Sequence, residues 1–249
     1  MLELAPGLGD GPALALVALS FFTSLITATF SLGGGSLMIA AMTLVLPPVV
    51  VVPVHGCVQL GSNAGRAWIM RRFIQWPFIL WLTLGAVAGS VIGGGFAQWL
   101  PERWFTGAIG LFVLVTTWLP QPKFIVGSRA VQFIGGMVTS AVGMVVGAAG
   151  PLVAAFVRGI PDRRELVATH AMLNAAQHLF KVIVFVVLGF AFAAYLPLIL
   201  LMVAAGYAGT SVGSRILTRI PERVFRLVFR VLLSAVALEL IRRAVLRAD

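Results

Sequence analysis

Two stretches of the chain place polar side chains at matching positions within otherwise apolar sequence. One begins at His55 and the other at His170, and in each the polar residues recur four, seven, eight and eleven positions later. This spacing places each set on one face of an α-helix. The two stripes are His55, Gln59, Ser62, Asn63 and Arg66, and His170, Asn174, Gln177, His178 and Lys181.

These residue types favour binding of an anion. Amide, hydroxyl and imidazole groups can donate hydrogen bonds, and each stripe ends in a cation, Arg66 or Lys181. Within the apolar segments the only carboxylate is Glu239, so a carboxylate relay for protons or sodium has no residues to use. If transport is coupled to protons, the histidines are the candidates that titrate near neutrality, with His170 and His178 preferred.

Other interpretations of the stripes stay open. One stripe alone could be hydrogen-bonding residues between packed helices, each bond worth under about 1–2 kcal/mol. Arg66 could extend to the membrane surface beside Arg71 and Arg72. Because the two stripes match position by position, however, we expect a central site or pathway.

A glycine-rich break precedes each stripe. Gly33–Gly35 interrupts one apolar run, and Gly147–Gly150 interrupts another. Broken membrane helices expose backbone N–H groups and the positive ends of half-helices, which favour anions near the midplane, although the glycines could instead serve close packing. The predicted substrate-binding residues are Gly33, Gly34, Gly35, Gln59, Asn63, Arg66, Gly147, Gly150, His170, Asn174, Gln177, His178 and Lys181.

The composition is that of an all-α polytopic membrane protein. The 249 residues are 60% hydrophobic and 10% charged, whereas soluble domains carry about 25% charged residues. The apolar runs are long enough for membrane helices and lack the alternation of strands. The net charge of +10 is scattered, so we expect it to orient the helices in a lipid bilayer and not to bind nucleic acid. The single Cys57 excludes an internal disulfide and a cysteine-based metal site, and no cofactor is implied.

Long apolar runs separated by polar, proline or glycine breaks define about eight main segments and two short ones. They are Ala13–Ser31, Ser36–Leu46, Val54–Met70, Trp76–Leu100, Trp104–Leu119, Ala130–Val146 with a short continuation to Val157, Leu166–Phe190, Tyr195–Leu217 and Val224–Ile241.

These segments form two related halves of one membrane domain, 1–249. Leu100-Pro101-Glu102-Arg103 recurs as Ile220-Pro221-Glu222-Arg223, 120 positions later, and the stripes match at an offset of 115. The repeats are 13–120 and 130–246, of about four segments each, and each opens with a glycine-broken or re-entrant helix.

Loop arginines favour an inverted relation between the two repeats, because the basic side changes at each matched loop. This topology requires the broken helices to be re-entrant hairpins and places the N-terminus outside. It also puts Arg242, Arg243 and Arg247 outside, against the usual rule.

An enzymatic function has little support in the sequence. Ser36 follows the glycine break, as the nucleophile of a membrane Ser/His hydrolase could, but no matching motif surrounds a histidine partner. Metal-assisted hydrolysis lacks a cluster of histidines and carboxylates. We therefore predict that the chain is not an enzyme.

The glycine-rich break early in each half, the following helix from His55 to Arg66, and the basic turn before Trp76 resemble the sulfite exporter TauE/SafE family over nearly the whole chain. The second break differs, reading Gly-Ala-Ala-Gly-Pro. The resemblance implies a multi-pass transporter of the bacterial inner membrane that exports sulfite, thiosulfate or an organosulfonate.

The predicted mechanism is alternating access around a midplane site between the two repeats. A passive anion channel and a membrane subunit of a larger complex are the alternatives. The oligomeric state is open, with a homodimer as one option.

Overall fold

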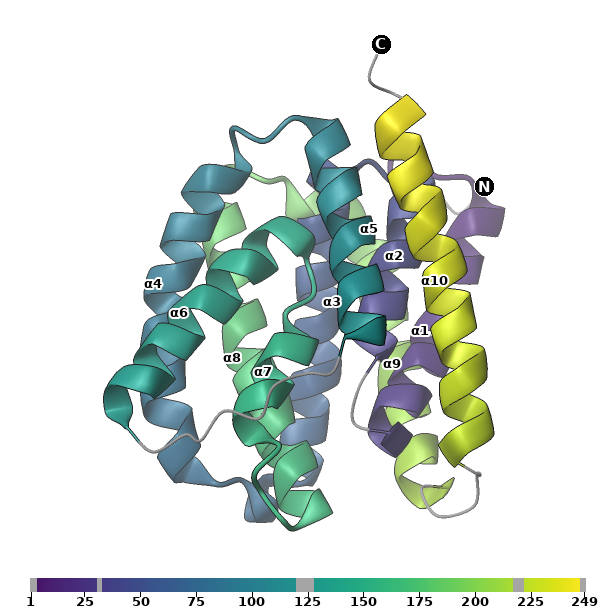
Figure 1. Cartoon of the computed structure of the whole chain (residues 1–249). Helices are drawn as coiled ribbons and strands as arrows, with labels where there is room; N and C mark the ends of the chain where they lie inside the picture. The colour runs from purple at the N-terminus through teal and green to yellow at the C-terminus, as the bar shows by residue number, and fades with distance from the viewer. Residues whose placement is uncertain (1–3, 31–32, 120–127, 217–221, 247–249) are drawn as a thin grey trace.

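A computed structural model of the chain describes residues 4–30, 33–119, 128–216 and 222–246, and all regular structure within these ranges is helical (Figure 1). The α-helices are α1 (Asp10–Phe30), α2 (Gly34–Val45), α3 (Pro48–Ile69), α4 (Ile79–Ala97), α5 (Glu102–Trp118), α6 (Arg129–Val146), α7 (Gly150–Val157), α8 (Arg163–Val187), α9 (Leu196–Ile216) and α10 (Glu222–Leu246). Three short 3-10 helices are η1 (Arg71–Phe73), η2 (Trp76–Phe78) and η3 (Phe192–Tyr195).

Among the residues that the structure describes, five helices are long and apolar enough to cross a membrane: Asp10–Ala28, Trp76–Ala97, Arg129–Val146, Arg163–Val187 and Phe192–Gly213. Large apolar side chains are also exposed along these helices, for example Leu80 and Val91 on α4 and Leu200 on α9. Contact of such an apolar surface with lipid is favourable, whereas its contact with water would be unfavourable. The prediction of an all-α polytopic membrane protein is confirmed.

The predicted start of the helix that carries the first stripe was too late. Val54 was expected to begin it, but α3 begins at Pro48 and contains Pro53. Pro48 is tolerated at the first helical position because the amides there have no helical partner, whereas Pro53 lies inside the helix. The extra turn brings the beginning of α3 next to the end of α2.

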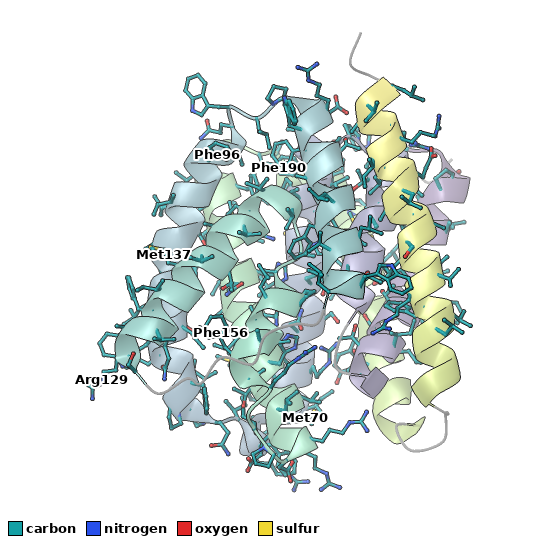
Figure 2. The ribbon with its side chains drawn as sticks, viewed as in Figure 1. Met70, Phe96, Arg129, Met137, Phe156 and Phe190 are labelled. Atoms are coloured by element: carbon teal, nitrogen blue, oxygen red, sulfur yellow. The ribbon has the colours of Figure 1, made fainter. Side chains whose placement is uncertain are left out.

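Each glycine break is the bend of a helical hairpin. Gly33 and Gly147 have φ angles of 97° and 76°, which favour glycine. After the second bend α7 runs back along α6, where the Phe156 ring covers Gly135 (Figure 2). After the first bend α2 runs back along α1, and Gly34 lies directly against the Thr23 carbonyl. Each hairpin therefore enters and leaves at one end of the molecule.

In each main helix pair the two helices come from different halves of the chain, and we call this exchanged packing. α1 lies parallel to α9, where Gly209 sits on the backbone of Phe21. α4 lies parallel to α6, where Gly89 sits on the backbone of Met137. The remaining main pairs, α3 with α8 and α5 with α10, are antiparallel. An inverted repeat requires this exchange, and the repeat assignment itself stays a prediction.

The two ends of the molecule differ in charge. The turns that carry Arg71 and Arg72 and that carry Arg163 and Arg164 lie at the lower end in Figure 1. Figure 2 places Met70 and Arg129 toward that end, and Phe96 and Phe190 toward the other.

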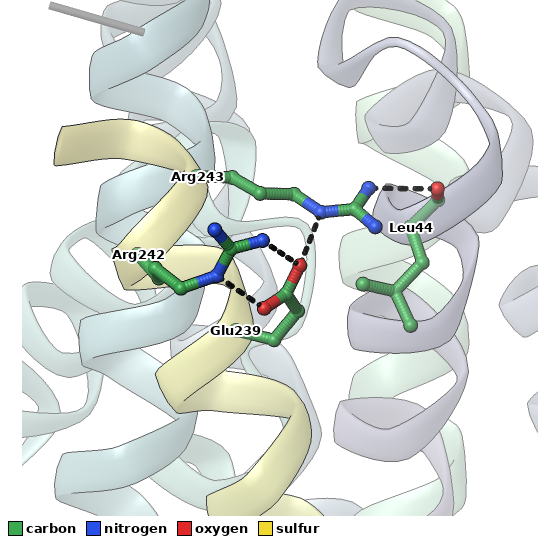
Figure 3. Close-up of polar contacts among 4 residues, drawn as sticks. All are labelled: Leu44, Glu239, Arg242 and Arg243. Carbon is green, nitrogen blue, oxygen red and sulfur yellow. Dashed lines mark hydrogen bonds and ion pairs between the residues drawn. The ribbon is translucent and has the colours of Figure 1, made fainter. Parts of the chain in front are cut away.

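At the upper end Glu239 forms ion pairs with Arg242 and Arg243, at 2.7 and 2.8 Å (Figure 3). Arg243 Nη1 also donates to the Leu44 carbonyl, 2.9 Å away, at the end of α2. The Glu239 carboxylate thus offsets part of the positive charge of Arg242 and Arg243, whose predicted position outside conflicted with the positive-inside rule.

Candidate functional site

A small cavity lies where the bends of the two hairpins meet α3 and α8. Its volume is about 30 Å³, enough for one or two water molecules. None of its lining residues is acidic. They are Thr27, Gly33, Gly35, Ser36, His55, Gln59, Asn63, Ala148, Gly150, Pro151, His170, Asn174 and His178.

Both short helices begin at this cavity. α2 follows Gly33 and α7 follows Ala149, and neither N-terminus has a side-chain cap. The first helical bond of α2 is Leu37 N–H to Gly33 O, so the preceding N–H groups in its first turn have no helical acceptor. Two helix N-termini therefore place partial positive charge and free amides beside the cavity, an arrangement that favours an anion.

The first histidine of each stripe holds the half-helix that lies next to it. His55 Nε2 donates to Gly35 O at 3.1 Å, and His170 Nε2 donates to Gly150 O at 2.9 Å. Both histidines are buried. His55 was predicted to belong to the stripe but not to the site, although its matched position with His170 was a signal for including it.

We expect His170→Phe to reduce anion exchange by roughly fivefold, because the lost hydrogen bond is worth about 1 kcal/mol. The aromatic ring retains most of the side-chain volume but cannot donate to Gly150 O, so the first turn of α7 is no longer held. Exchange of labelled anion across reconstituted vesicles is the measurement. His170→Gln, which can still donate, is the matched control, and equal rates for both variants would contradict the assigned role.

The asparagines of both stripes line the cavity with part of their hydrogen-bonding capacity already used. Asn174 Nδ2 donates to His170 O at 2.8 Å, and Asn63 Nδ2 donates to Gln59 O at 2.8 Å. Asn63 Nδ2 also donates to Gln59 Oε1 at 3.2 Å, which uses its second hydrogen, so only the NH₂ group of Asn174 can donate a further bond. Gln59 completes this part of the lining.

Five of the thirteen predicted residues do not line the cavity. Gln177 turns away and donates to Thr139 Oγ1 on α6 at 2.8 Å. Gly34 is packed against α1, and Gly147 is packed against Ile39. Ser62, at the matched position of the other stripe, forms a hydrogen bond with Ser24 on α1, with the two hydroxyl oxygens 3.2 Å apart. Ser62 and Gln177 therefore both link their own helix to a neighbouring one. The other two are the cations.

Arg66 and Lys181 are buried behind the cavity. Arg66 is 3% exposed, so it does not extend to the surface with Arg71 and Arg72. Its Nη1 donates to Asn63 Oδ1 at 3.2 Å, and its Nε atom has no hydrogen-bond partner. Lys181 Nζ donates to the Gly147 carbonyl at 2.6 Å. Both charges therefore act on the cavity from a distance.

Four further cavity residues were not predicted: Thr27, Ser36, Ala148 and Pro151. Ser36 and Pro151 occupy matched positions directly after the two glycine breaks, so the internal repetition could have indicated both. Thr27 comes from α1, and only the packing of the first hairpin brings it to the site.

The fold is that of a multi-pass membrane protein in which two broken helices meet at a small cavity. Within the described ranges, no group of three or more histidine, cysteine or acidic residues could hold a metal ion. The model of the sulfite exporter TauE/SafE family matches residues 16–240, and the chain belongs to that family. The chain matches no curated protein and no solved structure.

Proposed function

We propose that the chain exports a small sulfur-containing oxyanion across the bacterial inner membrane by binding it between the bends of the two hairpins. The observation that carries this proposal is the pair of uncapped half-helix N-termini, at Gly34 and Gly150, beside one cavity without acidic lining residues. Family membership supports the sulfur chemistry of the anion.

The groups proposed to bind the anion come from both halves of the chain. The first-turn amides of α2 and the Gly150 amide would donate to its oxygens, with the side chains of Asn63, Asn174 and His178 around them. Arg66 would add positive charge from behind Asn63. In a low-dielectric interior this charge acts over a longer range than it would in water.

The size of the cavity favours a compact anion. Because about 30 Å³ holds only one or two water molecules, the cavity must widen to bind an anion, and it must widen less for sulfite than for an extended organosulfonate. We therefore rank sulfite first, then thiosulfate, then larger sulfonates.

The exchanged packing of the helices supports an alternating-access mechanism. Repeats 13–120 and 130–246, related by inversion, would move against each other and open the cavity to one membrane face at a time. The arginine-rich lower end in Figure 1 would face the cytoplasm, following the positive-inside rule. The hairpin bends, which meet at the cavity, would remain near the midplane.

Counterflow in proteoliposomes tests this proposal. Vesicles that hold the purified chain and unlabelled sulfite, thiosulfate or methanesulfonate are diluted into the labelled anion. We expect transient, saturable accumulation of label for at least one anion. A passive channel would equilibrate the label without this overshoot, and a subunit that depends on other chains would show no flux. Either result would contradict the proposed carrier.

A further inference from the structure

Three basic side chains gather beside the bend between α6 and α7: His55 and His178 line the anion cavity, and Lys181 lies behind it. Lys181 Nζ donates to Gly147 O at 2.6 Å. The rings of His55 and His178 lie edge to face, with centroids 5.8 Å apart. The exposed fractions of Lys181, His55 and His178 are 3%, 0% and 4%. Because Lys181 does not line the cavity, the proposed anion binding leaves its amine without a direct role.

No acidic side chain in the described ranges is available to neutralise this cluster. Besides the thiol of Cys57, α3 and α8 place Arg66 and His170 nearby, and both of these are also basic. The neighbouring helices α2, α4 and α7 contain no charged residue. A buried cation without a counter-ion costs several kcal/mol. A permanently charged Lys181 is therefore costly while the cavity is empty.

The bend gives the protonated amine partial compensation. Gly147 caps the C-terminus of α6, where backbone carbonyls carry partial negative charge. The nearby His55 commits Nε2–H to Gly35 O, so its buried Nδ1 is left as an unused acceptor. His178 Nδ1 is likewise buried without a partner. A proton acceptor and a proton donor thus lie close together, buried at the wall of a cavity with room for only one or two water molecules.

We propose that Lys181, together with His55 and His178, binds a proton that crosses the membrane with the anion. This inference rests on the proposed function. An anion in the cavity stabilises the protonated amine, and by reciprocity the protonated amine strengthens anion binding. The empty carrier returns with Lys181 neutral. A divalent anion that moves with one proton keeps one negative charge, so an inside-negative membrane potential still favours its exit.

The test separates anion exchange from proton-driven accumulation. Thiosulfate is the probe because it stays fully ionised and carries no proton of its own, and potassium with valinomycin holds the membrane potential at zero. Wild-type vesicles with an acidic outside are expected to accumulate labelled thiosulfate. If the wild type exchanges sulfite but not thiosulfate, sulfite is used and uptake by protein-free vesicles is subtracted.

Two substitutions remove the proton step in different ways. Lys181→Met cannot be protonated, and Lys181→Arg cannot lose its proton but retains a donor for Gly147 O. In both we expect exchange at equal pH to persist while accumulation driven by the pH gradient falls about tenfold or more. Arg72→Met removes a cation that stacks on Phe73 at the membrane surface, and it should leave both activities unchanged.

Each other outcome is decisive. Normal proton-driven accumulation by either Lys181 variant would overturn the inference. Loss of equal-pH exchange in both variants would also overturn it, because Lys181 would then serve anion binding or folding. Exchange by the wild type without any response to the pH gradient would overturn the inference and leave the proposed function standing. Absence of exchange with every anion would overturn the proposed function itself.

Discussion

Gly150→Ala is expected to slow anion exchange about tenfold or more while leaving the protein folded. A Cβ atom at this position would lie 3.5 Å from Asn174 Oδ1 and 3.9 Å from His170 Cε1, which are ordinary contact distances. The methyl group would therefore fit, but it would occupy space at the cavity and shield the N-terminus of α7. Because the cavity is only about 30 Å³, we expect the exchange rate to fall about tenfold or more. A tenfold fall corresponds to an increase of about 1.4 kcal/mol in the activation free energy.

Gly159→Ala is the matched control for this substitution. Gly159 lies in the turn between α7 and α8, and a Cβ atom there meets nothing within 4 Å. Both variants should show the melting temperature of the wild type, and only Gly150→Ala should lose counterflow. Wild-type exchange by a folded Gly150→Ala would mean that the anion does not bind against this half-helix.

Gly89→Ala is expected to prevent stable folding, the largest effect on stability that we predict. Its Cβ atom would overlap the Met137 carbonyl oxygen, and the neighbouring backbone cannot rotate away as a side chain could. α4 and α6 would have to separate along a contact that small residues keep close. Overpacking typically costs about 1–3 kcal/mol, and we expect at least the upper part of this range. The yield of monodisperse protein and its melting temperature in detergent measure the effect.

Gly95→Ala provides the comparison within the same helix. Nothing lies within 4 Å of a Cβ atom at Gly95, and alanine is favoured over glycine in a helix by up to about 1 kcal/mol. This variant should match or exceed the wild type in melting temperature. If Gly89→Ala proved equally stable, the close parallel packing of α4 on α6 would be wrong.

The positions of the broken helices could be predicted from local sequence. Runs of apolar residues that end at a glycine-rich break predict a helix, a bend and a second helix. In the structure the second helices, α2 and α7, begin at Gly34 and Gly150. The preferred conformations of glycine act over a few residues, so this part of the fold needs no knowledge of distant neighbours.

Membership of a stripe was not enough to predict a cavity residue. His170, Asn174 and His178 line the cavity, but Gln177 faces α6 and Lys181 lies deeper. Eleven residues along a helix span about 16 Å, so one small cavity cannot contact a whole stripe. Which neighbour each position meets depends on the exchanged packing of α1 with α9 and of α4 with α6, and helical spacing does not contain that information.

Arg242 and Arg243 were predicted to lie on the outer side of the membrane, but their ion pairs with Glu239 were not predicted. Glu239, Arg242 and Arg243 stand three and four residues apart, the spacing of ion pairs on a helix. Because this spacing is visible in the sequence, the ion pairs could have been predicted, and they reduce the conflict with the positive-inside rule. The bond from Arg243 to Leu44 joins residues 199 positions apart, and it depends on tertiary packing alone.

The central claim is that an anion lies between the N-termini of α2 and α7, and a structure with bound selenite tests it most directly. Selenite is the heavier analogue of sulfite, and its selenium atom can be located by anomalous scattering. We predict one strong peak in the cavity, with oxygens about 3 Å from backbone nitrogens of the α2 first turn and of Gly150. A peak confined to other sites, or an empty cavity at a selenite concentration that inhibits sulfite exchange, would contradict the account.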